Sequence, residues 1–419
     1  MIKRLVWLGA AAGALLSCGP VFAACTIPFG AIMSVTGSLG VLGQPIAKTV
    51  QLAVDNVNAA GGVNGCQLDL HMLDDQTNPT VSVDDAKKLI DISHVPVIVG
   101  PLTSGATQAV MTSVAAPSKV VLITPSATSP VFTKLAKEGK FGGWFFRTAP
   151  SDALQGAALA KAAWDKGYRK VAILALNSSY GEGQGGAFAA GFKKLGGTIT
   201  NTVFYDASQS SYRSEVTKAM SPTPDAVLII GYPGDGTLLT REWIAAGGTQ
   251  NLLTTEGLKS ESYIKDVGPQ YFQKLVATAP GNVSTASTKP FDEAYAAKYG
   301  KVSTSPFVPN AYDAVVVAAL AMEEAKSDKP DAIRDAIRKV TATGGVEVDA
   351  GVAGLKKARE LLAKGKKIRY IGASGPLQFD KWGDVQDPMI TWGVTPDGKI
   401  KTTGEISIAD LHKLVSEGE

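Results

Sequence analysis

Polar residues that could bind a small ligand gather directly after short apolar segments of this 419-residue chain. The segment Gly100–Gly105 contains Ser104, and the segment Thr124–Pro130 offers further hydroxyls and carbonyls. A hydroxyl at the start of a predicted helix, beside the free backbone N–H groups of its first turn, forms a site for an anion such as a carboxylate. A second interpretation stays open, in which Ser104 only caps its own helix.

An acid and two phenols occupy similar positions further along the chain. Glu256, Tyr180 and Tyr232 each follow an apolar segment. A lone acid at the end of a strand is usually solvated, but in a cleft it pairs with a ligand ammonium through a bond about twice as strong as a neutral one. Tyrosine supplies both a ring wall and a phenolic donor. These residues predict a site for a small carboxylate that also carries an amine or a hydroxyl.

The elements that position these residues form two similar series. Short β-rich runs alternate with amphipathic segments from Thr26 to Thr124, and again from Ala153 to Thr255. In both series a helical segment ends in Gly-Gly, at 61–62 and at 196–197, before the next β-rich run. Such alternation builds a parallel sheet covered by helices on both faces. The predicted fold class is therefore α/β, with ligand expected at the carboxyl ends of the strands.

The last third of the chain changes in character. Helices are predicted at 311–325 and 331–339, whereas the glycine-rich passage 343–354 is interpreted as a surface loop. Strands are predicted around 375–380 and 389–394, with a hairpin turn at Pro396-Asp397-Gly398.

The first residues have the pattern of a secretory signal peptide. Lys3 and Arg4 precede an apolar run from Leu5 to Leu16, and small residues lead to a cleavage point after Ala23. We expect residues 1–23 to be removed. In an alternative interpretation Leu15–Cys18 is a lipoprotein box and Cys18 is acylated. Both interpretations place the mature chain outside the cytoplasm, in the periplasm.

Two cysteines remain after Cys18 is set aside. Cys25 and Cys66 precede the first two predicted strands, and neighbouring parallel strands lie about 4.8 Å apart, so cysteines at the same end can satisfy disulfide geometry. We expect a Cys25–Cys66 disulfide; the alternative is two buried free thiols. The three histidines, His71, His94 and His412, are widely separated, which argues against a metal site. No cofactor is expected.

The charge balance does not favour a nucleic-acid partner. Lys and Arg total 41, Asp and Glu total 38, and the net charge is +3. No basic run is interleaved with aromatic residues as in a nucleic-acid surface. The lysines between 356 and 367 have the spacing of a solvated helix face.

Several motifs together resemble one known family. They occur in the order and spacing of the branched-chain amino-acid binding proteins of bacterial ABC transporters, and the resemblance covers nearly the whole mature chain. The motifs are Gly-Gly-Val-Asn-Gly at 61–65, Asp74-Asp75-Gln76, Gly100–Ser104, Ser126-Ala127-Thr128, Phe146-Arg147-Thr148, Tyr180–Gly183, Glu256-Gly257 and Ala311–Ala314.

The resemblance implies the type I periplasmic binding fold, in which two α/β lobes are joined by three crossovers. It places residues 24–146 and 281–368 in lobe 1, and residues 147–280 and 369–419 in lobe 2. It implies a monomer that closes on an amino acid, an ABC permease as partner, and no enzymatic activity. A binding protein for an aromatic or aliphatic carboxylic acid or amide, or a ligand sensor on the same fold, is the alternative.

The resemblance also implies roles for individual residues. The serine that matches Ser104 holds the ligand carboxylate in that family. The threonine that matches Thr128 and the carbonyl that matches Ser126 surround the α-substituents. The residues that match Glu256 and Tyr180 complete the amino-group site.

Other ligand-binding residues implied by the resemblance are less closely defined. Ala127 lies within the same loop, and Tyr232 and Tyr312 match wall or closure positions. Leu42 stands where leucine-binding relatives place an aromatic residue, and Thr103 stands at a variable position. The polar end of the ligand is therefore better defined than its apolar end.

An enzyme is not supported by the remaining motifs. Gly181, Gly183 and Gly186 spell Gly-x-Gly-x-x-Gly, but the first glycine lies five residues beyond the preceding predicted strand, and only Asp206 could serve as the expected acid. A hydrolase would need a nucleophile elbow with a partner histidine, and the chain has none.

Overall fold

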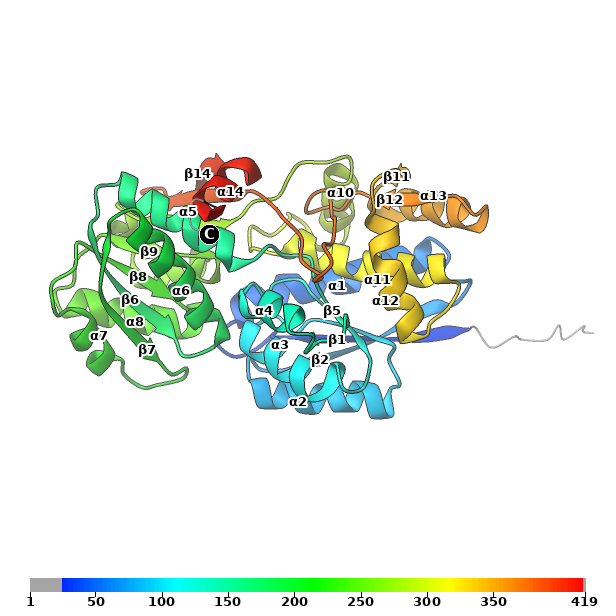
Figure 1. Cartoon of the computed structure of the whole chain (residues 1–419), viewed down its shortest axis with the longest axis horizontal. Coiled ribbons are helices and arrows are strands. Elements are labelled where there is room, and N and C mark those ends of the chain that lie inside the picture. The colour runs from blue at the N-terminus through cyan, green and yellow to red at the C-terminus, as the bar shows by residue number, and fades with distance from the viewer. Residues whose placement is uncertain (1–24, 417–419) are drawn as a thin grey trace, which may run out of the picture.

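The computed structural model describes residues 25–416, which form two α/β lobes around separate sheets (Figure 1). The first sheet has five strands in the order β2-β1-β3-β4-β5, all paired in parallel. Its strands are β1 (Thr26–Met33), β2 (Gln67–Asp74), β3 (Val97–Val99), β4 (Val121–Thr124) and β5 (Phe145–Arg147).

Helices from two distant parts of the chain cover the first sheet. The first group consists of α1 (Gly40–Ala59), α2 (Pro79–Lys87) with the π-helical turn η1 (Lys88–Ile92), α3 (Ser104–Val110) with the π-helical turn η2 (Met111–Ala115), and α4 (Val131–Lys137). The second group consists of α10 (Thr288–Tyr299), α11 (Val308–Ala325), α12 (Pro330–Thr341) and α13 (Gly351–Ala363), with the strand pair β11 (Val346–Val348) and β12 (Ile368–Tyr370).

Helix α11 is the centre of this lobe. Fifteen of its residues, from Val308 to Met322, are buried, because α11 packs against α1 and α12 and also against β3 and β4. A helix that is apolar on all sides has to be covered on all sides. Helix α12 covers α11 with one stripe only, formed by Ile333, Ile337 and Val340.

The second sheet has seven strands in the order β14-β13-β10-β9-β8-β6-β7. The strands are β6 (Lys170–Leu176), β7 (Thr198–Tyr205), β8 (Ala226–Ile230), β9 (Leu252–Thr254), β10 (Val276–Pro280), β13 (Met389–Val394) and β14 (Ile400–Ile406). The helices of this lobe are α5 (Asp152–Asp165), α6 (Ser179–Lys194), α7 (Arg213–Ala219), α8 (Pro233–Ala245), η3 (Glu256–Leu258), α9 (Glu261–Val267), η4 (Pro269–Phe272) and α14 (Ile408–Ser416).

The chain passes between the two lobes three times. It crosses between β5 and α5, between β10 and α10, and between β12 and β13. Strand β13 pairs antiparallel with both β10 and β14, so the hairpin predicted at 396–398 closes one edge of an otherwise parallel sheet. The architecture is the two-lobed type I periplasmic binding fold expected from the sequence.

The N-terminal edge of the first sheet carries the expected disulfide. Cys25 and Cys66 are joined, with an S–S distance of 2.08 Å, one residue before the first β1–β2 pair, Thr26 opposite Gln67. The prediction of a Cys25–Cys66 bridge is confirmed. The signal peptide 1–23 and Cys18 lie outside the described residues.

Several sequence-based expectations need correction, among them the strand predicted around 375–380, where the structure has none. The passage 343–354 is not a loop, because β11 pairs with β12 and α13 begins at Gly351. The sequence pattern predicts helices from Ile46 and from Gly185, but α1 and α6 begin at Gly40 and Ser179. Consequently Leu42 and Tyr180 lie in the first turns of helices instead of in loops.

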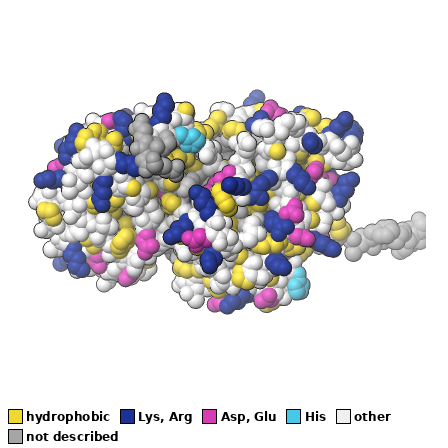
Figure 2. All heavy atoms as spheres, in the orientation of Figure 1, with side chains coloured by type: hydrophobic (Ala, Val, Ile, Leu, Met, Phe, Trp, Pro, Cys, Tyr) yellow, Lys and Arg dark blue, Asp and Glu magenta, His cyan; other side chains and the backbone are white. Residues whose placement is uncertain are grey.

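Two further properties concern the surface and the hydropathy of the helices. Basic and acidic side chains are intermixed on the face shown in Figure 2. Within residues 25–416 no helix combines the length and the apolar character that a membrane crossing requires.

Candidate functional site

A small cavity lies between the two lobes and is lined by residues of both. Lobe 1 contributes Leu39, Leu42, Ile46, Leu102, Ser126, Pro306 and Phe307, and lobe 2 contributes Tyr180, Tyr232, Glu256 and Gly257. Five of these residues, Leu42, Ser126, Tyr180, Tyr232 and Glu256, are ligand-binding residues expected from the sequence. The structure therefore brings residues from distant parts of the chain to one cavity.

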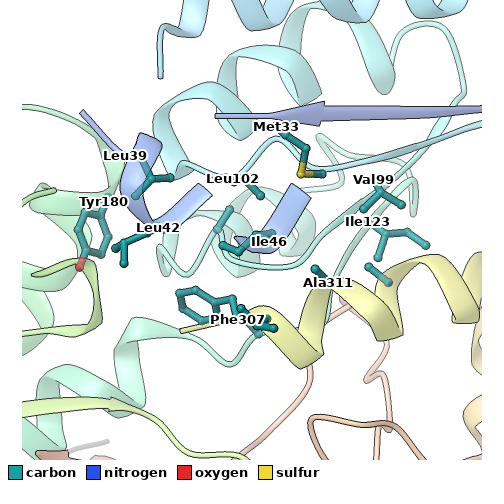
Figure 3. Close-up of a cluster of buried hydrophobic side chains, with 14 of the residues drawn as sticks. Met33, Leu39, Leu42, Ile46, Val99, Leu102, Ile123, Tyr180, Phe307 and Ala311 are labelled. Atoms are coloured by element: carbon teal, nitrogen blue, oxygen red, sulfur yellow. The ribbon is translucent and has the colours of Figure 1, made fainter. Parts of the chain in front are cut away.

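The lobe 1 side of the cavity is an apolar wall. Leu39, Leu42 and Ile46 are three and four residues apart, which places them on one face of α1. Figure 3 shows Phe307 beside Ile46, with the ring of Tyr180 next to Leu42. All of these side chains are buried. This wall can hold an apolar side chain by contact and by exclusion of water.

Glu256 is the acid on the opposite side of the cavity. It begins η3, separated from the end of β9 only by Thr255, and only 2% of its surface is exposed. Burial raises the pKa of Glu256, and hydrogen bonds to the carboxylate, among them one donated by Gln155 Nε2, act in the opposite direction. An acid in this environment gains strongly from a ligand cation.

The two tyrosines of lobe 2 form one rigid unit beside Glu256. Their rings stack with centroids 5.5 Å apart and an interplanar angle of 8°. The Tyr180 hydroxyl lies 2.7 Å from Thr255 Oγ1. Burial and the nearby Glu256 raise the pKa of both phenols, so they remain neutral. They present ring surface to the cavity, as predicted for tyrosines at these positions.

At the start of α3 the capping residue is Thr103, not Ser104. The Thr103 hydroxyl accepts a hydrogen bond from the Ala106 N–H at 3.3 Å. The interpretation of Ser104 as its own helix cap is therefore wrong. Ser104 is buried, and its Oγ accepts a hydrogen bond from the Ser129 N–H at 3.3 Å. Ser104 thus joins α3 to the loop that carries Ser126, Ala127 and Thr128.

This loop is held by several hydrogen bonds. Ser126 Oγ donates to the Leu102 carbonyl at 2.9 Å, and the Ala127 N–H donates to Thr124 Oγ1 at 3.1 Å. Thr128 Oγ1 donates to Asp152 Oδ2 at 2.9 Å. These contacts fix the loop, of which Ser126 lines the cavity, whereas Ala127 and Thr128 do not.

Arg147 anchors the same loop from behind. The side chain has no exposed surface, and its Nη1 donates to the carbonyls of Thr128 at 2.8 Å and Ser129 at 3.0 Å. Its Nε lies 2.7 Å from Asp384 Oδ1. Because Arg147 belongs to β5 and Asp384 to the third crossover, this ion pair connects the ligand loop to the segment that joins the lobes.

The two lobes contact each other around the cavity. The Gly234 N–H donates to the Ser38 carbonyl at 3.0 Å, and Ser129 Oγ donates to the Ser179 carbonyl at 2.7 Å. A Cβ atom at Gly183 would lie 2.6 Å from Ser129 Oγ. The structure therefore describes the closed arrangement of the lobes.

Tyr312 is placed differently from the expectation. Its hydroxyl accepts hydrogen bonds from Asn56 Nδ2 at 2.9 Å and from the Gly351 N–H at 3.0 Å. These partners hold α11 to α1 and α13 inside lobe 1, and Tyr312 does not line the interlobe cavity described above. The residue connects helices, because its position on the fully buried α11 turns it toward the lobe's own core.

Sequence reasoning missed four residues that shape the site. Asp152 and Gln155 lie one turn apart on α5, and Phe307 and Pro306 precede α11. Asp152 follows Ser151, a helix-capping residue, so that its sequence context resembled an ordinary helix start. Phe307 has a positive φ of 66°, which no sequence pattern indicated.

These features define a class of two-lobed binding proteins that enclose a small ligand between parallel-sheet lobes. The chain belongs to the periplasmic binding protein family, whose model matches residues 26–354. It shares this membership with Leu/Ile/Val-binding proteins of bacterial transport systems.

Two sequence relatives cover most of the chain. A Leu/Ile/Val-binding protein homologue of Brucella melitensis is 29% identical to this chain. The alignment covers 89% of this chain and 92% of the relative's length. The chemotactic signal transduction system substrate-binding protein BasB of Halobacterium salinarum is also 29% identical, over 83% of this chain and 81% of its own.

Two solved structures agree with these relatives. The leucine-binding protein LivK of Thermotoga maritima superposes with a TM-score of 0.76 at 25% identity and covers 92% of this chain and 99% of its own. LivJ of Streptococcus pneumoniae, in complex with isoleucine, has a TM-score of 0.73 at 25% identity and covers 91% of this chain and 99% of its own. Members of this family are substrate-binding proteins, not enzymes, and the family is periplasmic or extracellular.

Proposed function

We propose that this chain is the solute-binding component of an ABC importer and encloses an amino acid with a branched-chain or other apolar side chain. The observation that carries the proposal is the composition of the interlobe cavity, where one buried acid faces an apolar wall. A free amino acid has the complementary pattern, with charged groups at one end and an apolar group at the other. The Leu/Ile/Val-binding relatives support this choice.

The ligand head group meets polar residues of both lobes in this proposal. Its ammonium pairs with Glu256, assisted by Tyr180 and by the Thr128 hydroxyl. Its carboxylate lies against Ser104, near the first turn of α3, where backbone N–H groups favour an anion, and the Ser126 carbonyl faces the α-substituents. Ala127 and Thr103 shape the same end. Ser126 and Glu256 already line one cavity in the closed arrangement, which supports the assignment.

The ligand side chain lies against the apolar wall of lobe 1. Leu39, Leu42, Ile46 and Phe307 limit its size, and Tyr232 covers it from lobe 2. Because the wall carries aliphatic groups and one aromatic ring, it favours a compact aliphatic side chain such as that of leucine or isoleucine.

The remaining parts of the proposal follow from the family. The protein acts without catalysis, as a periplasmic monomer that delivers its ligand to an inner-membrane permease. The lobe boundaries at 146/147, 280/281 and 368/369 are supported by the sheets, since β1–β5 belong to one and β6–β10 with β13 and β14 to the other. Residues 1–23 serve as the signal peptide, with lipidation at Cys18 as the alternative.

Two observations favour alternatives that the test must include. Glu256 already accepts a hydrogen bond from Gln155, and burial raises its pKa, so a carboxylic acid without an amine is a second candidate ligand. The similarity to BasB favours a sensor that passes the ligand signal to a protein partner.

Calorimetry and thermal unfolding against a matched set of ligands test the proposal. The set contains leucine, isoleucine, valine, leucinamide, 4-methylpentanoate and 4-hydroxybenzoate. We expect leucine or isoleucine to bind with the highest affinity and to stabilise the protein by about 4 kcal/mol at a ligand concentration 1,000 times Kd. Binding of the acids without binding of any amino acid would contradict it. Uptake of radiolabelled ligand in a deletion strain separates transport from sensing.

A further inference from the structure

Asp152 is a fully buried acid directly behind the ligand loop. It lies in the first turn of α5, at the end of the first crossover, and has no exposed surface. Its N–H donates to the Thr128 carbonyl at 2.9 Å, and its Oδ2 accepts the Thr128 hydroxyl at 2.9 Å. Among residues 25–416 no group donates a hydrogen bond to Oδ1. A carboxyl group held this way stays ionised only with a positive charge nearby and otherwise takes up a proton.

The direction of the Thr128–Asp152 hydrogen bond determines what Thr128 offers to a ligand. A hydroxyl has one proton and two lone pairs. When the proton is donated to an ionised Asp152, only lone pairs remain on the ligand side, and Thr128 can accept a hydrogen bond but cannot donate one. A protonated or amide side chain at position 152 can donate to Thr128 Oγ1 instead, and the Thr128 proton is then free to turn toward the ligand.

The charged and titratable groups around Asp152 come from several elements. Glu256 of η3 opposes ionisation of Asp152, and Arg147 of β5 favours it. Tyr180 of α6 and Tyr232 before α8 also feel the charge of Asp152. Burial is the main reason that the pKa of Asp152 is raised well above its usual value. Two acids thus share a buried region whose nearest cation, Arg147, is already paired with Asp384.

We propose that Asp152 is a positioning residue that fixes the Thr128 hydroxyl as a hydrogen-bond acceptor, so that the site selects ligands with an ammonium over ligands with a hydroxyl in its place. This inference rests on the proposed function, because it requires that the α-substituent of the ligand meets Thr128. The ligand ammonium supplies the positive charge that the Asp152–Glu256 pair lacks. Binding of the ammonium therefore favours the ionised acids and releases a proton.

The selectivity should depend on pH in a defined direction. As pH falls, Asp152 or Glu256 takes up a proton, and the affinity for leucine decreases, whereas leucine itself stays a zwitterion over about pH 5 to 7.5. The affinity for 2-hydroxy-4-methylpentanoate, which carries a hydroxyl instead of the ammonium, should change much less. If Asp152 had a purely structural role and Glu256 alone titrated, Asp152→Asn would leave this difference between the two ligands unchanged.

The test compares these two ligands by calorimetry in the wild type and in Asp152→Asn. We expect Asp152→Asn to weaken leucine binding by about tenfold to a hundredfold, the range for a charge-assisted hydrogen bond, and to leave the hydroxy acid within about threefold. Asp152→Glu, which keeps the charge, should recover part of the selectivity for leucine. Asp235→Asn is the matched control, since Asp235 is also a buried acid in the first turn of a lobe 2 helix but is bound by Ser208 and Tyr212.

A double-mutant cycle with Thr128→Val isolates the contact between the two side chains. Once the hydroxyl is absent, Asp152→Asn should change the ratio of leucine to hydroxy-acid affinity by less than about threefold. Equal weakening of both ligands by Asp152→Asn, or an unchanged ratio in either single variant, would overturn the inference. If the wild type binds no amino acid, the proposed function fails first, and this inference with it. The pH series in the wild type shows whether the buried acids titrate on ligand binding, and its repetition in Asp152→Asn assigns the effect to Asp152 or to Glu256.

Discussion

The two lobes supply different chemistry to the same cavity. Lobe 1 lines it with Leu39, Leu42, Ile46 and Phe307, whereas lobe 2 lines it with Tyr180, Tyr232 and Glu256. The apolar wall lies mainly on one helix, α1, and depends on packing. The polar side depends on hydrogen bonds among strand ends and helix starts. The difference suggests that lobe 1 senses the shape of the ligand side chain and lobe 2 senses the charge of the head group.

The largest expected effect on stability comes from removing the disulfide of lobe 1. Replacing both Cys25 and Cys66 by serine should lower the free energy of unfolding of lobe 1 by about 4 kcal/mol, because the bridge closes a loop with a sequence separation of 41. Denaturant unfolding followed by lobe-specific probes measures the loss. Ligand affinity in the folded state should be unchanged, since the bridge lies at the amino end of the strands. A loss confined to lobe 2 would contradict this prediction.

The next effect concerns the connection between the lobes. Asp384→Asn should destabilise the protein by about 3 kcal/mol, because it leaves the buried Arg147 guanidinium without its counter-ion. Ligand affinity should also fall, since Arg147 holds the carbonyls of Thr128 and Ser129. Thermal unfolding and calorimetry on the same samples measure both effects.

A surface ion pair provides the control for Asp384→Asn. Asp55 pairs with Lys298, and both side chains are more than one-third exposed. Asp55→Asn should cost less than about 1 kcal/mol and leave ligand affinity unchanged. If the two variants behaved alike, the connection between crossover and ligand loop would have no energetic role.

The charge-sensing role of lobe 2 is tested by Glu256→Gln. The substitution keeps the shape and removes the charge, so binding of leucine should weaken by about 1.5 to 3 kcal/mol, or about 10- to 150-fold. Binding of 4-methylpentanoate should not weaken. Glu242→Gln is a suitable control, because Glu242 is a lobe 2 acid that is bound by Ser211 and Tyr212 away from the cavity. Full leucine affinity in Glu256→Gln would refute the assigned role.

The smallest expected effect belongs to the shape-sensing role of lobe 1. Leu42→Ala should weaken leucine binding by about 1 kcal/mol, or about fivefold, through lost apolar contact, and should improve the relative affinity of phenylalanine. Leu52→Ala is the control, because Leu52 is equally buried on α1 but does not line the cavity. Competition calorimetry measures the ratio. If the ratio of leucine to phenylalanine affinity were the same in Leu42→Ala and Leu52→Ala, the cavity-facing residues of α1 would not determine ligand size.

Much of the fold followed from local sequence patterns. The β-rich runs at 170–176, 198–205 and 226–230 predict strands, and β6, β7 and β8 have these bounds. The paired cysteines followed from the positions of the first two strands. The passage 343–354 was predicted wrongly, because its glycines suggested a loop. In the structure β11 pairs with β12 about twenty residues away, and that partner could not be inferred from local pattern.

The polar part of the site was predictable where a residue type itself suggested chemistry, and Leu42 followed from the family resemblance alone. Ser126, Tyr180, Tyr232 and Glu256 carry hydroxyls or a charge at segment ends, and the structure places them at one cavity. Phe307 was missed, because its role depends on the contact between distant segments. Asp152 was missed, because an acid in the first turn of a helix is usually explained by the helix dipole alone.

The contact between Gly234 and Ser38 is made by main-chain atoms only. This hydrogen bond between the lobes favours closure to the same extent with and without solute, since neither residue belongs to the cavity lining. It lowers the free energy of the empty closed form relative to the empty open form. A membrane partner that recognised only the surface of the closed protein would then also bind molecules without solute. To distinguish loaded from empty protein, it has to respond to the lifetime of the closed form.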